Sequence, residues 1–224
     1  MVDKMAAVRA LVLPLLACLS LHCAAAPFSV RLGEVPVVLD APAGFADTLD
    51  LASPRLQALA EGLTSASNRI LLFALTDADL RRFTVGDSPD LRRYLLLATP
   101  RALERESVGL SQFRKIAADA AANLGQPASP GNLRAILDSQ PVGQANYLAE
   151  LQRTPLMVSL LIGTRLPPRE GKPQYLLNTT TLLLLRGKQL VASAYAEFGE
   201  ELDDAWLRAL TRGWIDELQR LNAR

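Results

Sequence analysis

The rarest reactive side chains of this 224-residue sequence lie together near its start. The only histidine is His22, and the only cysteines are Cys18 and Cys23. Imidazole is the commonest general base, the thiolate is a strong nucleophile, and both groups dominate zinc, copper and haem coordination. A mature chain without this segment has neither group. We therefore expect no histidine- or cysteine-based catalysis, no disulfide and no cofactor.

Residues 1–25 have the pattern of a secretory signal peptide. Lys4 and Arg9 precede an apolar run over residues 10–21, and small residues follow. The run is too short to make a good transmembrane helix, which needs about 20 residues. We expect cleavage after Ala25, with Ala26 as a close alternative, and export to the periplasm. The mature chain is then a single domain over residues 26–224, with no transmembrane segment.

A second interpretation of the same segment concerns Cys18. The stretch Leu15-Leu16-Ala17-Cys18 resembles the lipobox of bacterial lipoproteins. In that family the cysteine is lipidated and becomes the first mature residue. This resemblance implies a lipid anchor at Cys18 and attachment to an envelope membrane. Mass spectrometry of the mature N-terminus distinguishes the two outcomes.

The charge of the mature chain is balanced. Removal of residues 1–25 leaves 22 basic and 22 acidic residues, so the formal net charge is zero. A nucleic-acid binder usually carries a clear excess of positive charge. The sequence therefore favours partners other than nucleic acid.

Two arginine pairs are the strongest candidates for a binding site. They are Arg81-Arg82 and Arg92-Arg93, and 19 of the 22 mature basic residues are arginine. Guanidinium groups bind carboxylate and phosphate groups in a bidentate manner, which suggests an anionic ligand or an acidic envelope partner. The alternative is that nearby acidic residues, such as Asp79 and Asp90, neutralise these arginines.

Two acidic groups have spacings that favour helix starts over chemistry. Asp77 and Asp79 follow a threonine, and the acidic stretch at residues 200–204 precedes a long amphipathic segment. Negative charge is stabilising at a helix N-terminus, and neither group has the spacing of a calcium loop. A hydrolase of envelope glycans that uses two carboxylates stays open as an alternative, because that chemistry needs no histidine. No spacing identifies such a pair.

Apolar runs predict the strands. Residues 28–32 and 35–39 are expected as two paired strands or as one strand with a bulge, and a loop follows at residues 40–44. The other predicted strands cover residues 70–75, 92–98, 156–162, 175–185 and 189–198. The last two flank a tight turn at residues 186–188, so we expect an antiparallel hairpin. The segment 167–173 is expected to link two strands, and residues 139–153 are ambiguous.

Cap residues and apolar periodicity predict the helices. Ser53-Pro54 begins a helix that we expect to end near Asn68, and Thr99-Pro100 repeats the same signal and is expected to start another helix or one turn of it. Further helices are expected over residues 77–83, 111–124, 132–138 and 203–221. The fold class is therefore α+β: a single sandwich domain with a largely antiparallel sheet packed by helices, including a long C-terminal helix.

The end of the chain carries a resemblance to a known fold. The stretch Leu182–Lys188, followed by Ala194-Tyr195-Ala196 and a helix that contains Trp206 and Trp214, resembles the hairpin-plus-helix ending of PsbP-like α/β/α sandwiches. This resemblance covers about 45 residues and implies an accessory or binding role. The sequence thus favours a non-enzymatic binding or accessory module of the bacterial envelope. The glycan hydrolase and a lipid-anchored assembly protein remain as alternatives.

Overall fold

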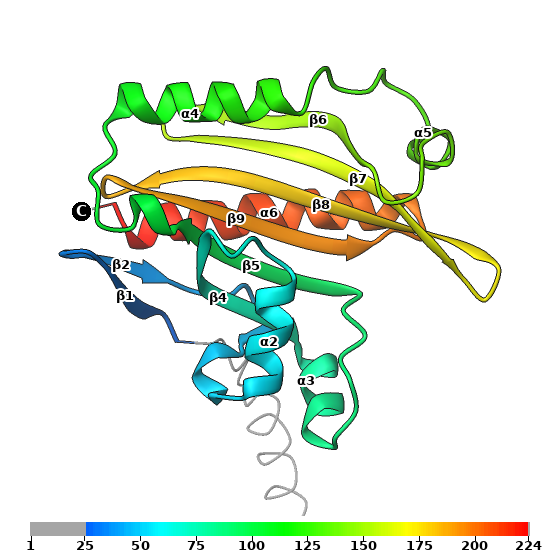
Figure 1. Ribbon diagram of the computed structural model, residues 1–224, viewed down its shortest axis with the longest axis horizontal. Coiled ribbons are helices and arrows are strands. Elements are labelled where there is room, and N and C mark those ends of the chain that lie inside the picture. Colours follow the sequence, from blue (N-terminus) through cyan, green and yellow to red (C-terminus); the bar gives the residue numbers. More distant parts are fainter. Residues whose placement is uncertain (1–25, 224) are drawn as a thin grey trace, which may run out of the picture.

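Seven antiparallel strands form the sheet on which the rest of the chain packs (Figure 1). The computed structural model describes residues 26–223. The strands lie in the order β3-β4-β5-β9-β8-β7-β6, and together with the helices they confirm the predicted single α+β domain. Their bounds are β3 Phe45–Asp47, β4 Asn68–Thr76, β5 Arg93–Pro100, β6 Ala145–Thr154, β7 Met157–Arg169, β8 Lys172–Leu185 and β9 Lys188–Glu197.

A second, two-stranded sheet precedes this one. β1 (Phe28–Leu32) and β2 (Val35–Leu39) pair antiparallel, so the first of the two interpretations of this region is confirmed. Leu32, Val37 and Leu39 are fully buried in the core beneath the C-terminal helix. The hairpin therefore extends the apolar layer on that side of the large sheet.

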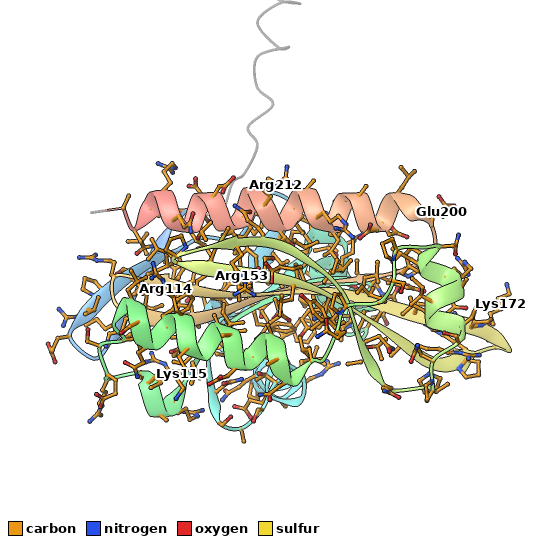
Figure 2. All side chains as sticks on the ribbon, turned by 90° about the horizontal axis from the view of Figure 1, so that it is seen from above. Arg114, Lys115, Arg153, Lys172, Glu200 and Arg212 are labelled. Carbon is orange, nitrogen blue, oxygen red and sulfur yellow. The ribbon has the colours of Figure 1, made fainter. Side chains whose placement is uncertain are left out.

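Helices cover both faces of the large sheet. α6 (Glu201–Leu221) lies along one face and α4 along the other, as Figure 2 shows through Arg212 on α6 and Arg114 on α4. On α6, Leu207, Trp214 and Leu218 are buried at helical spacing, which produces the apolar stripe expected from the sequence. The remaining helices are α2 Pro54–Gly62, α3 Asp77–Thr84, α4 Leu110–Asn123 and α5 Leu133–Asp138, with 3-10 turns η1 at Leu49–Leu51 and η2 at Arg101–Leu103.

Two-residue turns connect β7 to β8 and β8 to β9. Arg186 and Gly187 both have positive φ values, 51° and 74°, as a tight turn that matches the strand twist requires. Glu170 and Gly171 do the same, with φ values of 51° and 75°. The predicted turn at residues 186–188 is confirmed. The segment 167–173 joins two strands as expected, but most of it belongs to the strands themselves.

One predicted helix boundary is wrong, and one predicted helix start leads to a single turn. The helix that begins at Pro54 ends at Gly62, and Asn68 instead begins β4. The intervening residues bond locally, as in the hydrogen bond that the Ser67 backbone N–H donates to the Ser65 hydroxyl at 3.3 Å, and such bonds compete with helix formation. The Thr99-Pro100 signal lies in β5 and is followed by a single 3-10 turn, which agrees with the shorter of the two expected outcomes. The Thr99 hydroxyl donates to the Gln189 carbonyl across the sheet, so it does not cap a helix.

Strand β6 fills the part of the chain whose pattern was ambiguous. Its pairing with β7 shifts register twice, between Tyr147 and Ala149 and between Glu150 and Gln152. Each shift interrupts the alternation of inward and outward side chains, which is the signal that marks a strand in a sequence. Within residues 26–223, no helix has the length and apolar composition needed to cross a bilayer.

Candidate functional site

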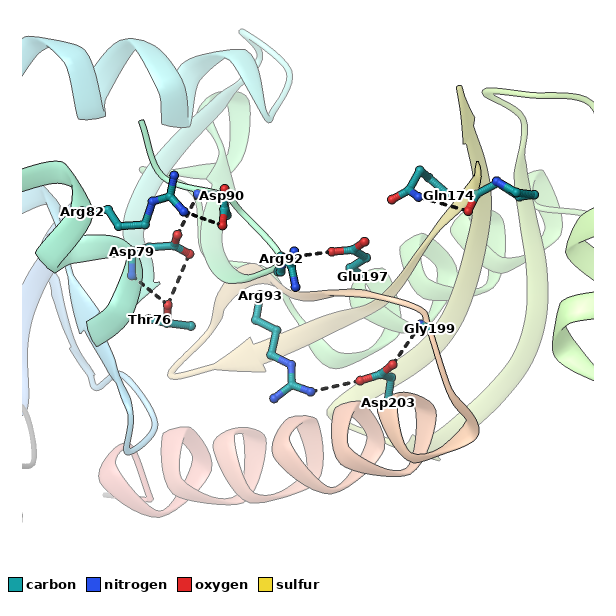
Figure 3. A network of polar contacts seen from close by, with 11 residues as sticks. Thr76, Asp79, Arg82, Asp90, Arg92, Arg93, Gln174, Glu197, Gly199 and Asp203 are labelled. Carbon is teal, nitrogen blue, oxygen red and sulfur yellow. Dashed lines mark hydrogen bonds and ion pairs between the residues drawn. The ribbon is translucent and has the colours of Figure 1, made fainter. Parts of the chain in front are cut away.

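Three strands and two helices meet at one end of the sheet and bring charged residues together there. Because the strands are antiparallel, the end of β4, the start of β5 and the end of β9 meet there, with Leu75 opposite Tyr94 and Arg93 opposite Ala196. Helix α3 leaves from β4, and α6 follows β9. Between them lies a hollow of about 640 Å³, which we call the α3–α6 hollow (Figure 3). It is lined by Thr76, Ala78, Asp79, Arg82, Asp90, Arg92, Arg93, Glu197, Gly199 and Asp203.

The structure brings together three of the four arginines proposed from the sequence. Arg82, Arg92 and Arg93 line the α3–α6 hollow. Arg81 is exposed on α3 and does not line it, and within residues 26–223 it forms no ion pair. The two arginine pairs of the sequence therefore do not act as four equivalent cations.

Asp79 organises the α3 side of the hollow. The Thr76 hydroxyl accepts a hydrogen bond from the Asp79 backbone N–H at 3.2 Å, which caps α3 as the sequence predicts. The Asp79 carboxylate is 5% exposed and accepts from the Thr76 hydroxyl and, at 2.7 Å, from the backbone N–H of Asp90. This buried carboxylate therefore ties the loop before β5 to the start of α3.

Two exposed ion pairs line the mouth of the hollow. Arg82 donates to Asp90 at 2.8 Å, and Arg92 Nε lies 3.4 Å from Glu197 Oε2. The Arg92 side chain is 70% exposed. Exposed ion pairs of this kind contribute only about 0–1 kcal/mol to stability, because water screens them and two long side chains must be ordered. These arginines can therefore exchange partners at little cost.

Arg93 is held more firmly than the other two. Its guanidinium donates to Asp203 at 3.0 Å and lies 4.0 Å from the ring centroid of Trp206. A guanidinium over an indole face gains from the negative potential of the ring. Trp206 itself packs against the core beneath α6. Arg93 thus connects β5 to the first turns of α6, and its contacts with Asp203 and Trp206 hold its guanidinium in place at the hollow.

Asp203 is held in its ionised form. Burial raises its pKa, but the backbone N–H groups of Gly199 and Glu200 and the guanidinium of Arg93 outweigh this effect, so the pKa lies below its ordinary value. The two backbone bonds measure 2.9 and 3.0 Å. The same carboxylate completes the N-terminal cap of α6, which agrees with the helix start expected for the acidic stretch at residues 200–204.

The hollow as a whole is a mixed-charge surface. Its lining side chains include three guanidinium groups and four carboxylates. A surface with both signs can donate hydrogen bonds to a ligand's acidic groups and accept them from its basic groups. It offers no strong preference for a purely anionic ligand, because such a ligand would also face the carboxylates.

The sequence missed the carboxylates that come from distant segments. Asp90 was expected to neutralise an arginine and does so, but Asp79 bonds to backbone and hydroxyl groups instead. The partners of Arg92 and Arg93 are Glu197 and Asp203, which lie about 100 residues further along the chain. Only the pairing of β5 with β9 brings them close. One sequence signal could have indicated these partners: Glu197 lies near the end of one predicted strand, and Asp203 begins the helix that follows it.

Two expectations lie beyond this site. Cys18 and the predicted signal peptide fall outside the described residues. Within residues 26–223, no group of three His, Cys, Asp or Glu side chains is arranged to hold a metal ion.

Comparison with models of known protein families and with curated proteins finds no match for this chain. The inference about function therefore rests on the sequence and the structure of this chain alone.

Proposed function

We propose that this chain is a non-enzymatic binding module of the bacterial cell envelope. Its recognition site is the α3–α6 hollow, and its ligand is peptide-like and carries charges of both signs. The observation that carries the proposal is the convergence of seven charged side chains from α3, the loop before β5, β5, β9 and α6 around one hollow of about 640 Å³. Ligand sites in proteins commonly have volumes of roughly 300–1,000 Å³.

The arrangement of the ion pairs supports a ligand with both charges. Arg82 and Arg92 are exposed at the mouth, and their carboxylate partners can be exchanged for those of a ligand. When a ligand carboxylate takes Arg92, Glu197 is left without its partner, and a ligand ammonium group can replace it. No net ion pair is lost in this exchange. Arg93 and Asp203 stay paired below and keep the hollow in shape.

The N-terminal residues and the end of the chain support an envelope location and an accessory role. The signal-peptide pattern of residues 1–25 favours export, with lipidation of Cys18 as the route to a membrane anchor. The resemblance of the C-terminal hairpin and helix to PsbP-like sandwiches is in keeping with a module that binds and does not catalyse. Fold-level likeness alone does not determine a function, so the proposal rests on the hollow.

The α3–α6 hollow gives the glycan-hydrolase alternative no support. A glycosidase needs one carboxyl group that stays protonated near neutral pH. Asp203 has a lowered pKa, and Asp79 accepts two hydrogen bonds. Asp90 and Glu197 each face a guanidinium group. Every carboxylate of this hollow is therefore already engaged by a hydrogen-bond donor or a guanidinium group.

Calorimetric titration with defined peptides tests the proposal. The probe is an end-blocked peptide of alternating Lys and Glu, and its controls are the matching Gln peptide and a poly-Glu peptide. We expect the mixed-charge peptide to bind most tightly, and added salt to weaken its binding. Arg92→Gln should weaken binding at least fivefold. Arg81→Gln removes the same charge from the exposed face of α3 and should change the affinity by less than twofold.

Two outcomes would overturn the proposal. Equal binding of the mixed-charge and Gln peptides would show that the charged residues of the hollow do not select the ligand. An equal effect of Arg81→Gln and Arg92→Gln would show that only overall charge matters. Stronger binding of poly-Glu would instead favour the anionic ligand that the arginine pairs first suggested.

A further inference from the structure

A second hollow, of about 420 Å³, lies at the opposite end of the β4–β5 pair. It is bounded by α2, the loop at residues 63–67, the start of β4 and the start of η2. Asn68 pairs with Pro100 at this end of the two strands, whereas Leu75 pairs with Tyr94 at the end that faces the α3–α6 hollow. We call it the α2–β4 hollow. It shares no lining residue with the α3–α6 hollow.

The α2–β4 hollow has an apolar part and a polar part. Leu49 and Ile70 contribute partly exposed apolar side chains, which pack against the core cluster beneath α2, and the fully buried Ala60 lies behind them. The polar side chains are those of Gln57, Glu61, Thr64, Ser65, Asn68, Arg69 and Arg101. An apolar surface with a few placed polar groups is the usual composition of a site for a small molecule.

Hydrogen bonds fix the polar wall. The Asn68 amide donates to the Thr64 hydroxyl at 3.1 Å. Arg101 is anchored twice to the opposing loop, because its backbone N–H donates to the Ser67 carbonyl at 2.9 Å and its Nε donates to the Ala66 carbonyl at 3.2 Å. The guanidinium of Arg101 is therefore oriented before any ligand arrives, which lowers the entropy lost on binding.

The charges of this wall differ from those of the α3–α6 hollow. Arg69 is ion-paired with Glu104, whereas Arg101 has no ion pair within residues 26–223. With Nε bonded to a carbonyl, the two terminal nitrogens of Arg101 are available to an acceptor. The lining residues include two arginines and one acidic residue, Glu61, which already accepts from Gln57 at 2.9 Å. The wall therefore favours one negative charge on a ligand.

We infer that the α2–β4 hollow is a binding site for a small amphipathic carboxylic acid. The carboxylate binds the guanidinium of Arg101, and a short apolar chain or ring lies over Leu49 and Ile70. One guanidinium suits one carboxylate, since the two planar groups match in a bidentate manner. A phosphate group would have only this one unpaired cation, and it would leave the apolar floor without a partner.

The test is titration of the full mature chain with 3-phenylpropionate, followed by heteronuclear NMR. Its neutral amide, 3-phenylpropionamide, has nearly the same shape and serves as the ligand control. We expect saturable shifts at the amides of residues 60–70 and 101, and an affinity for the acid at least tenfold above that for the amide. Equal affinities, or no saturable shift in these residues, would overturn the inference.

Variants locate the carboxylate. Arg101→Gln should weaken binding of 3-phenylpropionate at least tenfold, and Arg101→Lys should weaken it less, because the charge remains but the planar donor pair is lost. Arg81→Gln, on the exposed surface of α3, should leave the affinity within twofold. An unchanged affinity of Arg101→Gln would contradict the assignment. The acid-against-amide comparison uses the unaltered sequence, so it decides the question even if a variant fails to fold.

The two binding proposals can fail separately. Arg92→Gln should leave the binding of 3-phenylpropionate unchanged, because Arg92 lines only the α3–α6 hollow. Likewise, Arg101→Gln should leave the binding of the mixed-charge peptide unchanged. Loss of both ligands in either variant would show a general loss of the folded state.

Discussion

Replacement of Asp79 tests how the sequence builds the α3–α6 hollow. Its buried carboxylate accepts the backbone N–H of Asp90 at 2.7 Å and the hydroxyl of Thr76 at 3.2 Å. In Asp79→Ala, the Asp90 amide loses a charge-assisted hydrogen bond in a partly buried position, which costs about 1.5–3 kcal/mol. The loss of negative charge in the first turn of α3 adds about 0.3–1 kcal/mol. We expect a total loss of about 2–4 kcal/mol in the free energy of unfolding.

Two further variants separate the causes. Asp79→Asn keeps an oxygen that can accept from Asp90 but loses the charge and the acceptor for the Thr76 hydroxyl, so it should cost about 1–2 kcal/mol, less than Asp79→Ala. Asp77→Ala is the matched control, because Asp77 is an exposed carboxylate in the same helical turn. It should cost less than about 1 kcal/mol, the value of the helix-dipole contribution alone.

Urea unfolding at pH 7, followed by circular dichroism, measures these differences through the midpoint and the slope m. An unchanged slope would show that the variants differ in stability and not in the compactness of either state. If Asp79→Ala lost no more stability than Asp77→Ala, the bond from Asp90 would contribute nothing. The Asp79 carboxylate would then not be what holds the loop before β5 in position.

The remaining predictions concern the core and the pH dependence of stability. A Cβ on Gly163 would lie 2.7 Å from the Leu137 side chain and 2.8 Å from the Leu148 side chain. Gly163→Ala should therefore lower the free energy of unfolding by about 1–3 kcal/mol. Gly62→Ala is the control and should not lower it, because a Cβ there would meet no atom within 4 Å. Burial raises the pKa of Asp47 although backbone N–H groups partly offset it, so its ionised form destabilises the fold at neutral pH. Because the folded pKa exceeds the unfolded one, this penalty disappears as the pH falls toward the ordinary value. Asp47→Asn should therefore be more stable than the parent at pH 7, and the difference should vanish near pH 3, by urea unfolding at both values; a less stable variant at pH 7 would refute the sign.

The fold was predictable where one signal dominated. The stretches at residues 28–39 and 175–198 combine β-branched or apolar runs with short turns, and both form the expected hairpins. The C-terminal helix follows from the spacing of Leu207, Trp214 and Leu218, all of which are buried. In these segments local propensity and the final packing agree, so the sequence pattern alone is sufficient.

The prediction was wrong or silent where tertiary contacts decide. Of the two outcomes expected after Thr99-Pro100, the full helix does not form and a single 3-10 turn does, and the Thr99 hydroxyl bonds to the Gln189 carbonyl on the neighbouring strand. Strand β6 was not predicted because its register shifts twice against β7. In both cases the partner lies far along the chain, and nothing local to these residues indicates it.

The ion-pair partners in the candidate site could likewise not be predicted from the local sequence alone. The arginines at residues 82, 92 and 93 are visible in the sequence, and their local acidic neighbours suggested neutralisation. Two of the three carboxylate partners, Glu197 and Asp203, come from the end of β9 and the first turn of α6, about 100 residues further along the chain. An anionic ligand was the reasonable expectation from the arginines alone, whereas the assembled hollow favours a ligand with both charges.

The antiparallel order of the strands explains why both hollows lie at ends of the same strand pair. The middles of β4 and β5, residues 71–75 and 94–98, are buried, so their polar residues are restricted to the ends. At one end, Thr76 and Arg93 meet the acidic end of β9 and the start of α6. At the other end, Asn68 and Arg101 meet α2 and its loop, Arg69 pairs with Glu104, and within residues 26–223 Arg101 stays without a carboxylate partner. The apolar strands therefore determine where polar chemistry can occur, and the neighbouring elements determine its charge.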